Sequence, residues 1–297
     1  MNNVKSVNKI KRDKAIFIIL FLLPAILHFC VFYIYINGSS LFLAFKNENG
    51  FTLEYFGRFF NQLSKSGSDI SLALRNTLIF FIFGNFIIFP LSLMFSFILY
   101  KKVYGYKYFR IVFFLPSIIS AVVLVTLYKN ILNGPISDLY MQINHTNVNP
   151  LFLNSTERAL KSILVYQVWL GLAGNMIIYS GTMSRIPQEV IESSKLDGLG
   201  FFGELWYMVI PIIWPTLSTL ILLSVVNIFG ASGPILLFTQ GDYGTTTIAY
   251  WIFAQSTSLN PDYNYASAVG LFFTLVQLAL VFFVRWLSNK KNEKVEY

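Results

Sequence analysis

Two carboxylates, Glu189 and Glu192, lie three residues apart in a short polar segment, residues 186–200 (IPQEVIESSKLDGLG). Strongly apolar blocks flank this segment on both sides. Pro187 suits the first turn of a helix, and both carboxylates follow near the helix N-terminus, where negative charge is favourable. The spacing therefore favours a charged helix that faces solvent, and it offers electrostatic pairing rather than bond-making chemistry.

The same segment has a clear end. Asp197 followed by Gly198 predicts that the helix stops there, and we expect Gly198 and Gly200 to adopt left-handed backbone conformations. A helix of two to three turns is the expected structure. The alternative is an ordinary solvated loop that contains one helical turn.

Motifs for catalysis or nucleotide binding are absent from the chain. The only histidines are His28 and His145, the single cysteine is Cys30, and no H-E-x-x-H or Ser/His/Asp pattern occurs. There is no G-x-x-x-x-G-K-[ST] loop, because GDYGTTT lacks both the spacing and the lysine. We expect a protein that is not an enzyme and binds no metal.

Composition places the chain in a membrane. Of its 297 residues, 55% are hydrophobic and only 12% are charged, whereas about 25% are charged in soluble domains. The net charge of +8 does not indicate nucleic-acid binding, because the basic residues form short clusters beside apolar blocks.

Six apolar blocks are long enough to span a bilayer, which takes about 20 residues as a helix. None alternates with period two, so an all-α helical bundle is expected rather than a barrel. The blocks are residues 15–36, 74–100, 109–132, 161–183, 206–231 and 265–287.

Lysine and arginine gather in alternate connecting segments, which sets the orientation. They are concentrated in residues 1–14, 101–110, 184–205 and 285–297. The prediction is a multi-pass protein of the cell membrane, with a cytoplasmic N-terminal segment (1–14), a transmembrane domain (15–287) and a cytoplasmic tail (288–297). The polar segment falls in the cytoplasmic loop 184–205. Residues 37–73 lie outside and suit an amphipathic segment of undefined role.

The cytoplasmic loop carries a recognisable pattern. Glu192-Ser193-Ser194, three residues, Gly198, nine residues and then MVIP resembles the E-A-A-x3-G-x9-I-x-L-P loop of ABC importer permeases. The run IPQEVIESSKLDGLGFFGELWYMVIPIIWP resembles the carbohydrate-uptake branch of that family, the maltose and glycerol-phosphate type. Serine replaces both alanines, and M-x-I-P replaces I-x-L-P.

Other segments resemble the same family. They are LRNTLIFFIFGN in the second span, FRIVFFLPSIIS in the third, LLFTQGDYGTTTIAYWIFAQ in the last external loop and YNYASAVGLFF in the last span. The family's T-G-G-G-P reads TQGDY here, a departure from the pattern.

The resemblance implies a six-helix permease of the type I importer fold, in which the short cytoplasmic helix docks on an ATPase subunit. The coupling surface that it implies consists of Glu189, Glu192, Ser193, Ser194, Asp197, Gly198 and Leu199. Such a helix transmits ATPase closure to the bundle as a rigid-body displacement.

The resemblance also implies the partners: a second permease subunit in a heterodimer, two ATPase subunits that hold ATP and Mg²⁺, and an extracellular solute-binding protein. The expected cargo is an oligosaccharide or related sugar, and the host is expected to be bacterial. The competing interpretation is a secondary carrier or channel for a small polar solute, or a scaffold subunit.

Polar residues inside the spans are the candidates for a substrate pathway. We predict that Asn175, Tyr179 and Asn227 contribute to it. Asn85, Gln255 and Gln277 are further candidates, and the alternative for each is a hydrogen bond between helices.

Overall fold

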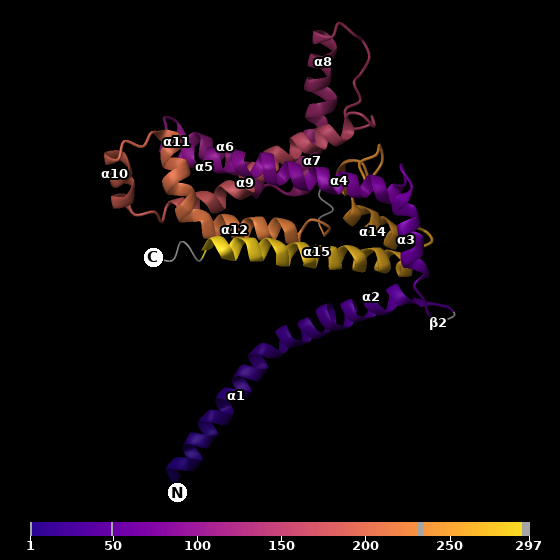
Figure 1. The fold of residues 1–297 in the computed structure, drawn as a ribbon, viewed down its shortest axis with the longest axis vertical. Coiled ribbons are helices and arrows are strands. Elements are labelled where there is room, and N and C mark those ends of the chain that lie inside the picture. Colours follow the sequence, from indigo (N-terminus) through magenta and orange to yellow (C-terminus); the bar gives the residue numbers. More distant parts are fainter. Residues whose placement is uncertain (1, 49, 231–233, 293–297) are drawn as a thin grey trace. The chain divides into compact units, whose positions relative to one another are not determined.

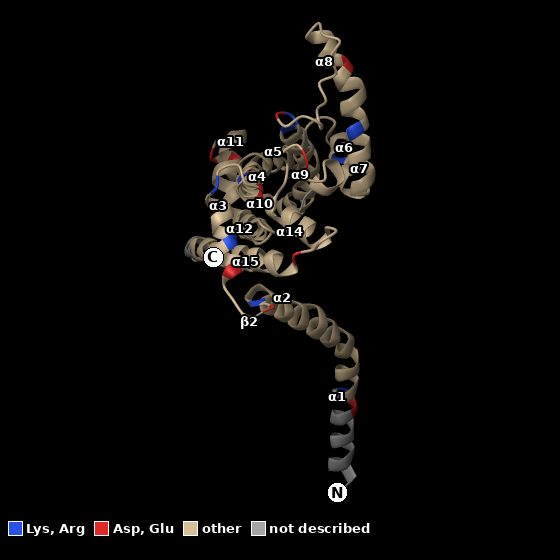
Figure 2. Cartoon of the chain, turned by 90° about the vertical axis from the view of Figure 1, so that its right-hand side faces the viewer, with Lys and Arg blue, Asp and Glu red and all other residues tan. Residues whose placement is uncertain are grey.

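The computed structural model describes residues 2–48, 50–230 and 234–292, and the chain divides into two compact units (Figure 1). One unit comprises Met1–Phe60 and Gln255–Phe272, and the other comprises Asn61–Ala254 and Phe273–Tyr297. Almost all regular structure is helical. The ribbon in Figure 2 is mostly tan, because charged residues are few along the helices. The predicted all-α membrane architecture is confirmed.

The first span is a continuous helix in the first unit, made of α1 (Asn2–His28), η1 (Phe29–Tyr35) and α2 (Ile36–Phe45). It extends past the predicted end at residue 36, although NGSS follows. Asn37 Nδ2 donates to the carbonyl of Tyr33 (2.7 Å), and Ser39 Oγ donates to the carbonyl of Ile36 (2.8 Å). These polar side chains satisfy backbone groups of the helix and so do not terminate it.

A short hairpin and an amphipathic helix follow. Strand β1 (Lys46–Asn47) pairs antiparallel with β2 (Gly50–Phe51), with Lys46 opposite Phe51. Helix α3 (Glu54–Ser64) buries Phe59, whose ring lies 4.8 Å from that of Phe272. The expected amphipathic segment within residues 37–73 is therefore a helix.

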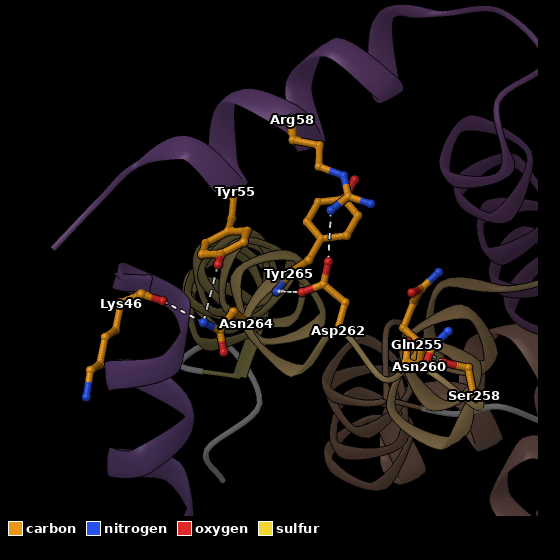
Figure 3. Close-up of polar contacts among 9 residues, drawn as sticks. All are labelled: Lys46, Tyr55, Arg58, Gln255, Ser258, Asn260, Asp262, Asn264 and Tyr265. Atoms are coloured by element: carbon orange, nitrogen blue, oxygen red, sulfur yellow. Dashed lines mark hydrogen bonds and ion pairs between the residues drawn. The ribbon is translucent and has the colours of Figure 1, made fainter. Parts of the chain in front are cut away.

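Polar contacts connect α3 to the start of the last span, α15 (Tyr263–Asn292) (Figure 3). Arg58 Nη1 lies 2.8 Å from Asp262 Oδ2, and its guanidinium lies 4.1 Å from the centre of the Tyr265 ring. Asn264 Nδ2 donates to the carbonyl of Lys46 at 2.6 Å. Arg58, Asp262 and Tyr265 are called the brace below.

The second unit contains the second to fifth spans and the part of α15 that follows Phe272. A 32-residue helix comprises α4 (Asp69–Phe83), η2 (Gly84–Ile88) and α5 (Phe89–Tyr100). It is followed along the chain by α9 (Ala159–Met183) and by α11 (Phe201–Gly203), η4 (Glu204–Val209) and α12 (Ile210–Val226). The last two predicted blocks agree with the structure to within about five residues at each end, although residue 231 lies outside the described part of the chain.

The third predicted span is not one straight helix. Helix α6 (Tyr106–Ile118) is bent by 110° from a second helix, Ala121–Ile143, which contains α7 (Ala121–Ile131), η3 (Leu132–Ile136) and α8 (Ser137–Ile143). Ile119 and Ser120 between them have extended backbone (ψ 142° and 138°). Among the described residues, five helices are thus long and apolar enough to cross a membrane alone, and the bent pair supplies a sixth span if counted as one.

The segment between the third and fourth apolar blocks, residues 133–160, also differs from the expectation. Residues expected to form a loop after 132 instead continue the helix to Ile143, and α8 projects beyond the other helices of this unit (Figures 1 and 2). Arg158 supports the return of the chain, since it donates to the carbonyl of Pro150 (2.6 Å) and to the Tyr140 hydroxyl (3.1 Å).

The segment predicted to form the last external loop folds against α4. It contains α13 (Ile235–Phe238) and α14 (Ile248–Thr257). Asn76 Nδ2 donates to the carbonyls of Gly244 (2.7 Å) and Thr246 (2.9 Å), and the amide of Ile248 donates to Thr77 Oγ1 (3.0 Å). These buried bonds hold the segment against the start of the second span.

Candidate functional site: a cavity among three spans and a polar helix beside them

A cavity of about 370 Å³ lies within the second unit, among the α4–η2–α5 helix, α9, α12 and the 234–247 segment. Its size suits a small ligand or part of a larger one. The polar residues that line it are Thr77, Asn85, Gln167, Asn175, Ser224, Asn227 and Thr247. Phe80, Phe81 and Phe89 supply aromatic surface.

Close packing of two helices shapes one wall. A Cβ added to Gly171 on α9 would lie 2.7 Å from Ile88 Cγ2 of η2. No side chain larger than hydrogen fits there without a shift of Ile88 or of the helices. Gly171 therefore sets how near α9 approaches the second span and, with it, the width of the cavity.

The polar groups that line the cavity differ in whether they form hydrogen bonds within the protein. Ser224 Oγ donates to Asn85 Oδ1 (2.8 Å), and Asn85 Nδ2 donates to the carbonyl of Phe81 (2.9 Å). Asn227 Nδ2 donates to the carbonyl of Leu223 (2.8 Å). These bonds fix the orientation of the two asparagines on their helices.

Gln167 and Asn175 retain free hydrogen-bonding groups. Gln167 Oε1 is buried and has no hydrogen-bond partner among the described residues. Asn175, two turns further along α9, makes no side-chain hydrogen bond within the same part of the chain. A buried oxygen such as Gln167 Oε1 is costly to leave without a partner, and Asn175 is half-buried with its amide open to one, so both groups are suited to bind a polar ligand.

No charged side chain lines the cavity among the described residues. An ionic ligand would lose its hydration there without a compensating counter-charge. The donors, acceptors and aromatic faces instead match a neutral polyhydroxylated molecule. Within the described residues there is also no cluster of His, Cys, Asp and Glu that could hold a metal ion.

The predicted pathway residues separate into two groups. Asn175 and Asn227 line the cavity, as does Asn85. Tyr179 does not, because its side chain is fully buried in an apolar cluster with Phe97 and Met183, and its hydroxyl has no partner among the described residues.

The other two further candidates, Gln255 and Gln277, fall outside the cavity lining. Gln277 Nε2 donates to the carbonyl of Val226, which is the helix-to-helix bond that was the alternative for such residues. The sequence reasoning missed Gln167 as a candidate for the substrate pathway. Its position in the middle of an apolar block would have justified its selection.

The polar segment forms helix α10 (Gln188–Leu196), at one end of the unit beside α11 (Figure 1). The predicted short helix is confirmed. Exposed positions on and after it are Glu189, Glu192, Ser193, Asp197 and Gly198. Ser194 is buried and donates to the carbonyl of Ile191 (2.8 Å), and Leu199 is half-buried.

The end of α10 is a glycine cap. Gly198 has φ +75°, and the Leu199 amide donates to the carbonyl of Ser194 (3.2 Å), which is the six-to-one bond of such caps. The expected left-handed conformation of Gly200 is wrong: this residue has φ −73° and ψ 174°. Gly200 precedes α11, where an extended residue is usual before a helix.

Helix α10 is attached to the bundle on one side and exposed on the other. Ile186 is buried in the apolar cluster of Phe97, Tyr179 and Met183, and Val190 and Ile191 pack against it. Leu196 is 88% exposed on the outer side. This apolar residue was not included in the predicted coupling surface, because sequence alone does not reveal which leucine of the segment faces the bundle.

Comparisons with known proteins agree with this geometry. No protein-family profile matches the chain. It is 26% identical to the lactose transport system permease protein LacF of Rhizobium radiobacter, over 92% of this chain and 94% of that one. It is 22% identical to the multiple sugar-binding transport system permease protein MsmF of Streptococcus mutans, over 93% and 94% respectively.

Solved structures share the fold. A chain of a bacterial ABC transporter involved in the import of the acidic polysaccharide alginate superposes with a TM-score of 0.81, at 24% identity, over 96% of this chain and 99% of that chain. Another structure of a bacterial alginate ABC transporter, in complex with an alginate pentasaccharide-bound periplasmic protein, gives 0.80 at 24% identity, over 95% and 96%. The resemblance to carbohydrate-type importer permeases is thus confirmed, and the chain is a multi-pass membrane protein.

Proposed function

From this homology to permease subunits of sugar transport systems, we propose that the chain is one transmembrane subunit of an ATP-driven, binding-protein-dependent importer of a neutral oligosaccharide. The observation that carries the proposal is the cavity, which combines two free amide side chains, Gln167 and Asn175, with aromatic surface and, within the described part of the chain, no charged lining residue. These groups suit sugar hydroxyls, which both donate and accept hydrogen bonds.

The described residues that line the cavity carry no charge, which fits an uncharged cargo better than the acidic polysaccharide imported by the transporter of this chain's structural relative. That relative belongs to a transporter of an acidic polysaccharide. Carboxylates in the cavity described above would meet only neutral amides, hydroxyls and apolar groups. We therefore assign uncharged sugars to this chain.

ATP hydrolysis is assigned to two partner subunits that bind ATP and Mg²⁺, and a second permease subunit completes the membrane domain. Helix α10 would dock on one ATPase subunit through Glu189, Glu192, Ser193 and Asp197, with Leu196 added to that surface. A solute-binding protein delivers the sugar from outside. Both termini and α10 lie in the cytoplasm in this arrangement.

Uptake by the reconstituted complex tests the proposal. The complex is purified through a tag on this chain, placed in liposomes with ATP inside, and supplied with its binding protein and a panel of neutral and uronate-containing oligosaccharides. We expect ATP-dependent uptake of neutral sugars only. Uptake driven by an ion gradient without a co-purified ATPase would favour the carrier, and uptake of uronates would refute the neutral assignment.

A variant pair then tests the cavity itself. Gln167→Leu removes a free amide from the cavity, and we expect the sugar concentration for half-maximal uptake to rise about fivefold to tenfold, as for one lost hydrogen bond. Gln142→Leu, on the exposed surface of α8, is the matched control and should leave uptake unchanged. Equal effects of the two changes would show that the cavity is not the path.

A further inference from the structure

A buried ion pair lies beside α10 and outside the cavity. Lys101 caps the end of α5, and Glu204 is the first residue of η4. Lys101 Nζ contacts Glu204 Oε2, and the two residues are 103 positions apart in the sequence. The Glu204 side chain is 4% exposed and that of Lys101 is 21% exposed. The pair therefore connects the end of the second span to the start of the fifth.

Glu204 has Lys101 as its one side-chain partner among the described residues. Its other oxygen, Oε1, is buried and has no hydrogen-bond partner among the described residues. A carboxylate in such surroundings is stabilised by its one cation and little else. Because buried ion pairs contribute little net stability, a pair placed here is better explained by the geometry that it fixes.

Aromatic and apolar side chains pack around the ion pair. Lys101 Nζ lies 5.6 Å from the centre of the Phe97 ring, and the Phe97 and Phe201 rings are 4.8 Å apart. Phe97 belongs to the apolar cluster that also contains Leu205 and Ile186. Ile186, two residues before α10, and Leu205, directly after Glu204, thus pack in one cluster beside the ion pair.

Three helices that line the cavity converge on this cluster. The helix that carries Asn85 ends at Tyr100, directly before Lys101, and the helix that carries Ser224 continues from η4, which begins at Glu204. The third, α9, carries Gln167 and leads through residues 184–187 into α10. At 1.5 Å per residue, Asn85 lies roughly 24 Å along its helix from Lys101.

We propose that the Lys101–Glu204 pair is a positioning joint that makes the second and fifth spans follow a displacement of α10. The proposal rests on the function proposed above. With the pair intact, a push on α10 moves the cluster and the ends of both spans together, and the cavity walls follow. Without it, α10 still docks and ATP is still hydrolysed, but the second span lags and the cavity opens inefficiently.

The measurement is the number of ATP molecules hydrolysed per sugar imported, in the same liposomes. For Glu204→Gln and for Lys101→Met we expect this ratio to rise about fivefold or more, with ATP hydrolysis stimulated by the binding protein as in the wild type. The exchange of both residues, Lys101→Glu with Glu204→Lys, should restore most of the coupling. Lys102→Met, an exposed neighbour, is the matched control.

An unchanged ratio in assembled single variants would overturn the joint while leaving the importer function intact. If wild-type liposomes import no sugar, the function proposed above fails instead. If the single variants do not assemble, the uncharged pair Lys101→Met with Glu204→Leu decides the question. A raised ratio in that double variant supports the joint, and a wild-type ratio refutes it.

Discussion

Two ion pairs, Arg58–Asp262 and Lys101–Glu204, connect distant parts of the described chain, and they do so in different surroundings. In the brace, Arg58 and Asp262 lie 2.8 Å apart, with 49% and 33% of their side chains exposed. The joint pair, Lys101 and Glu204, is nearly enclosed. Water competes for the first pair and weakens it, whereas the second pair has few other partners. Loss of the enclosed pair should therefore lower stability more than loss of the exposed pair.

The largest effect is expected when one charge of the joint is left alone. Lys101→Met leaves the Glu204 carboxylate buried and unpaired, which costs about 3–5 kcal/mol of folding free energy. Removal of both charges, by Lys101→Met with Glu204→Leu, should return most of that loss. Thermal unfolding of the purified complex measures both, and a double variant no more stable than the single one would contradict the burial argument.

A smaller loss of stability is expected at the end of α10, where the substitution strains the backbone and leaves the charges unchanged. Gly198→Ala forces a left-handed conformation on alanine, at roughly 1–2 kcal/mol, although no atom lies within 4 Å of the new Cβ. Gly200→Ala, in extended backbone, is the matched control and should be nearly neutral. We expect sugar-stimulated ATP hydrolysis to fall for Gly198→Ala only; equal losses would mean that the cap is not responsible.

In the brace, we expect Asp262→Ala to lower stability by about 1 kcal/mol, mainly because it removes a helix cap. The Tyr265 amide donates to Asp262 Oδ1 at 3.0 Å at the start of α15, so Asp262→Ala removes a helix cap as well as the ion pair. Asp262→Asn retains an oxygen for the cap. We expect thermal unfolding to separate the two variants, with the asparagine variant close to the wild type.

The smallest effect is expected for the brace ion pair itself. Arg58→Gln should change stability by less than about 1 kcal/mol, and the difference from wild type should shrink further in high salt, because the pair is exposed. Thermal unfolding at low and high salt gives both numbers. A loss as large as that of Lys101→Met would remove the contrast between the two regions.

Sequence reasoning reached only part of the candidate site. Asn175 and Asn227 could be selected because amides are costly within apolar blocks, and both line the cavity. Tyr179 was selected as another polar residue within an apolar block, but it lies in an apolar cluster. The side of a helix that faces a cavity depends on how the helix is rotated against its neighbours, and composition does not specify that rotation.

Local chemistry determined the six apolar blocks, the short helix in residues 186–200 and its glycine cap, because length, apolarity and turn residues act over a few positions. Tertiary structure alone decided the 110° bend in the third block, the free amide of Gln167 in the cavity and the contact of Lys101 with Glu204. These features depend on which distant residues meet, and the choice of partners is a property of the packed bundle.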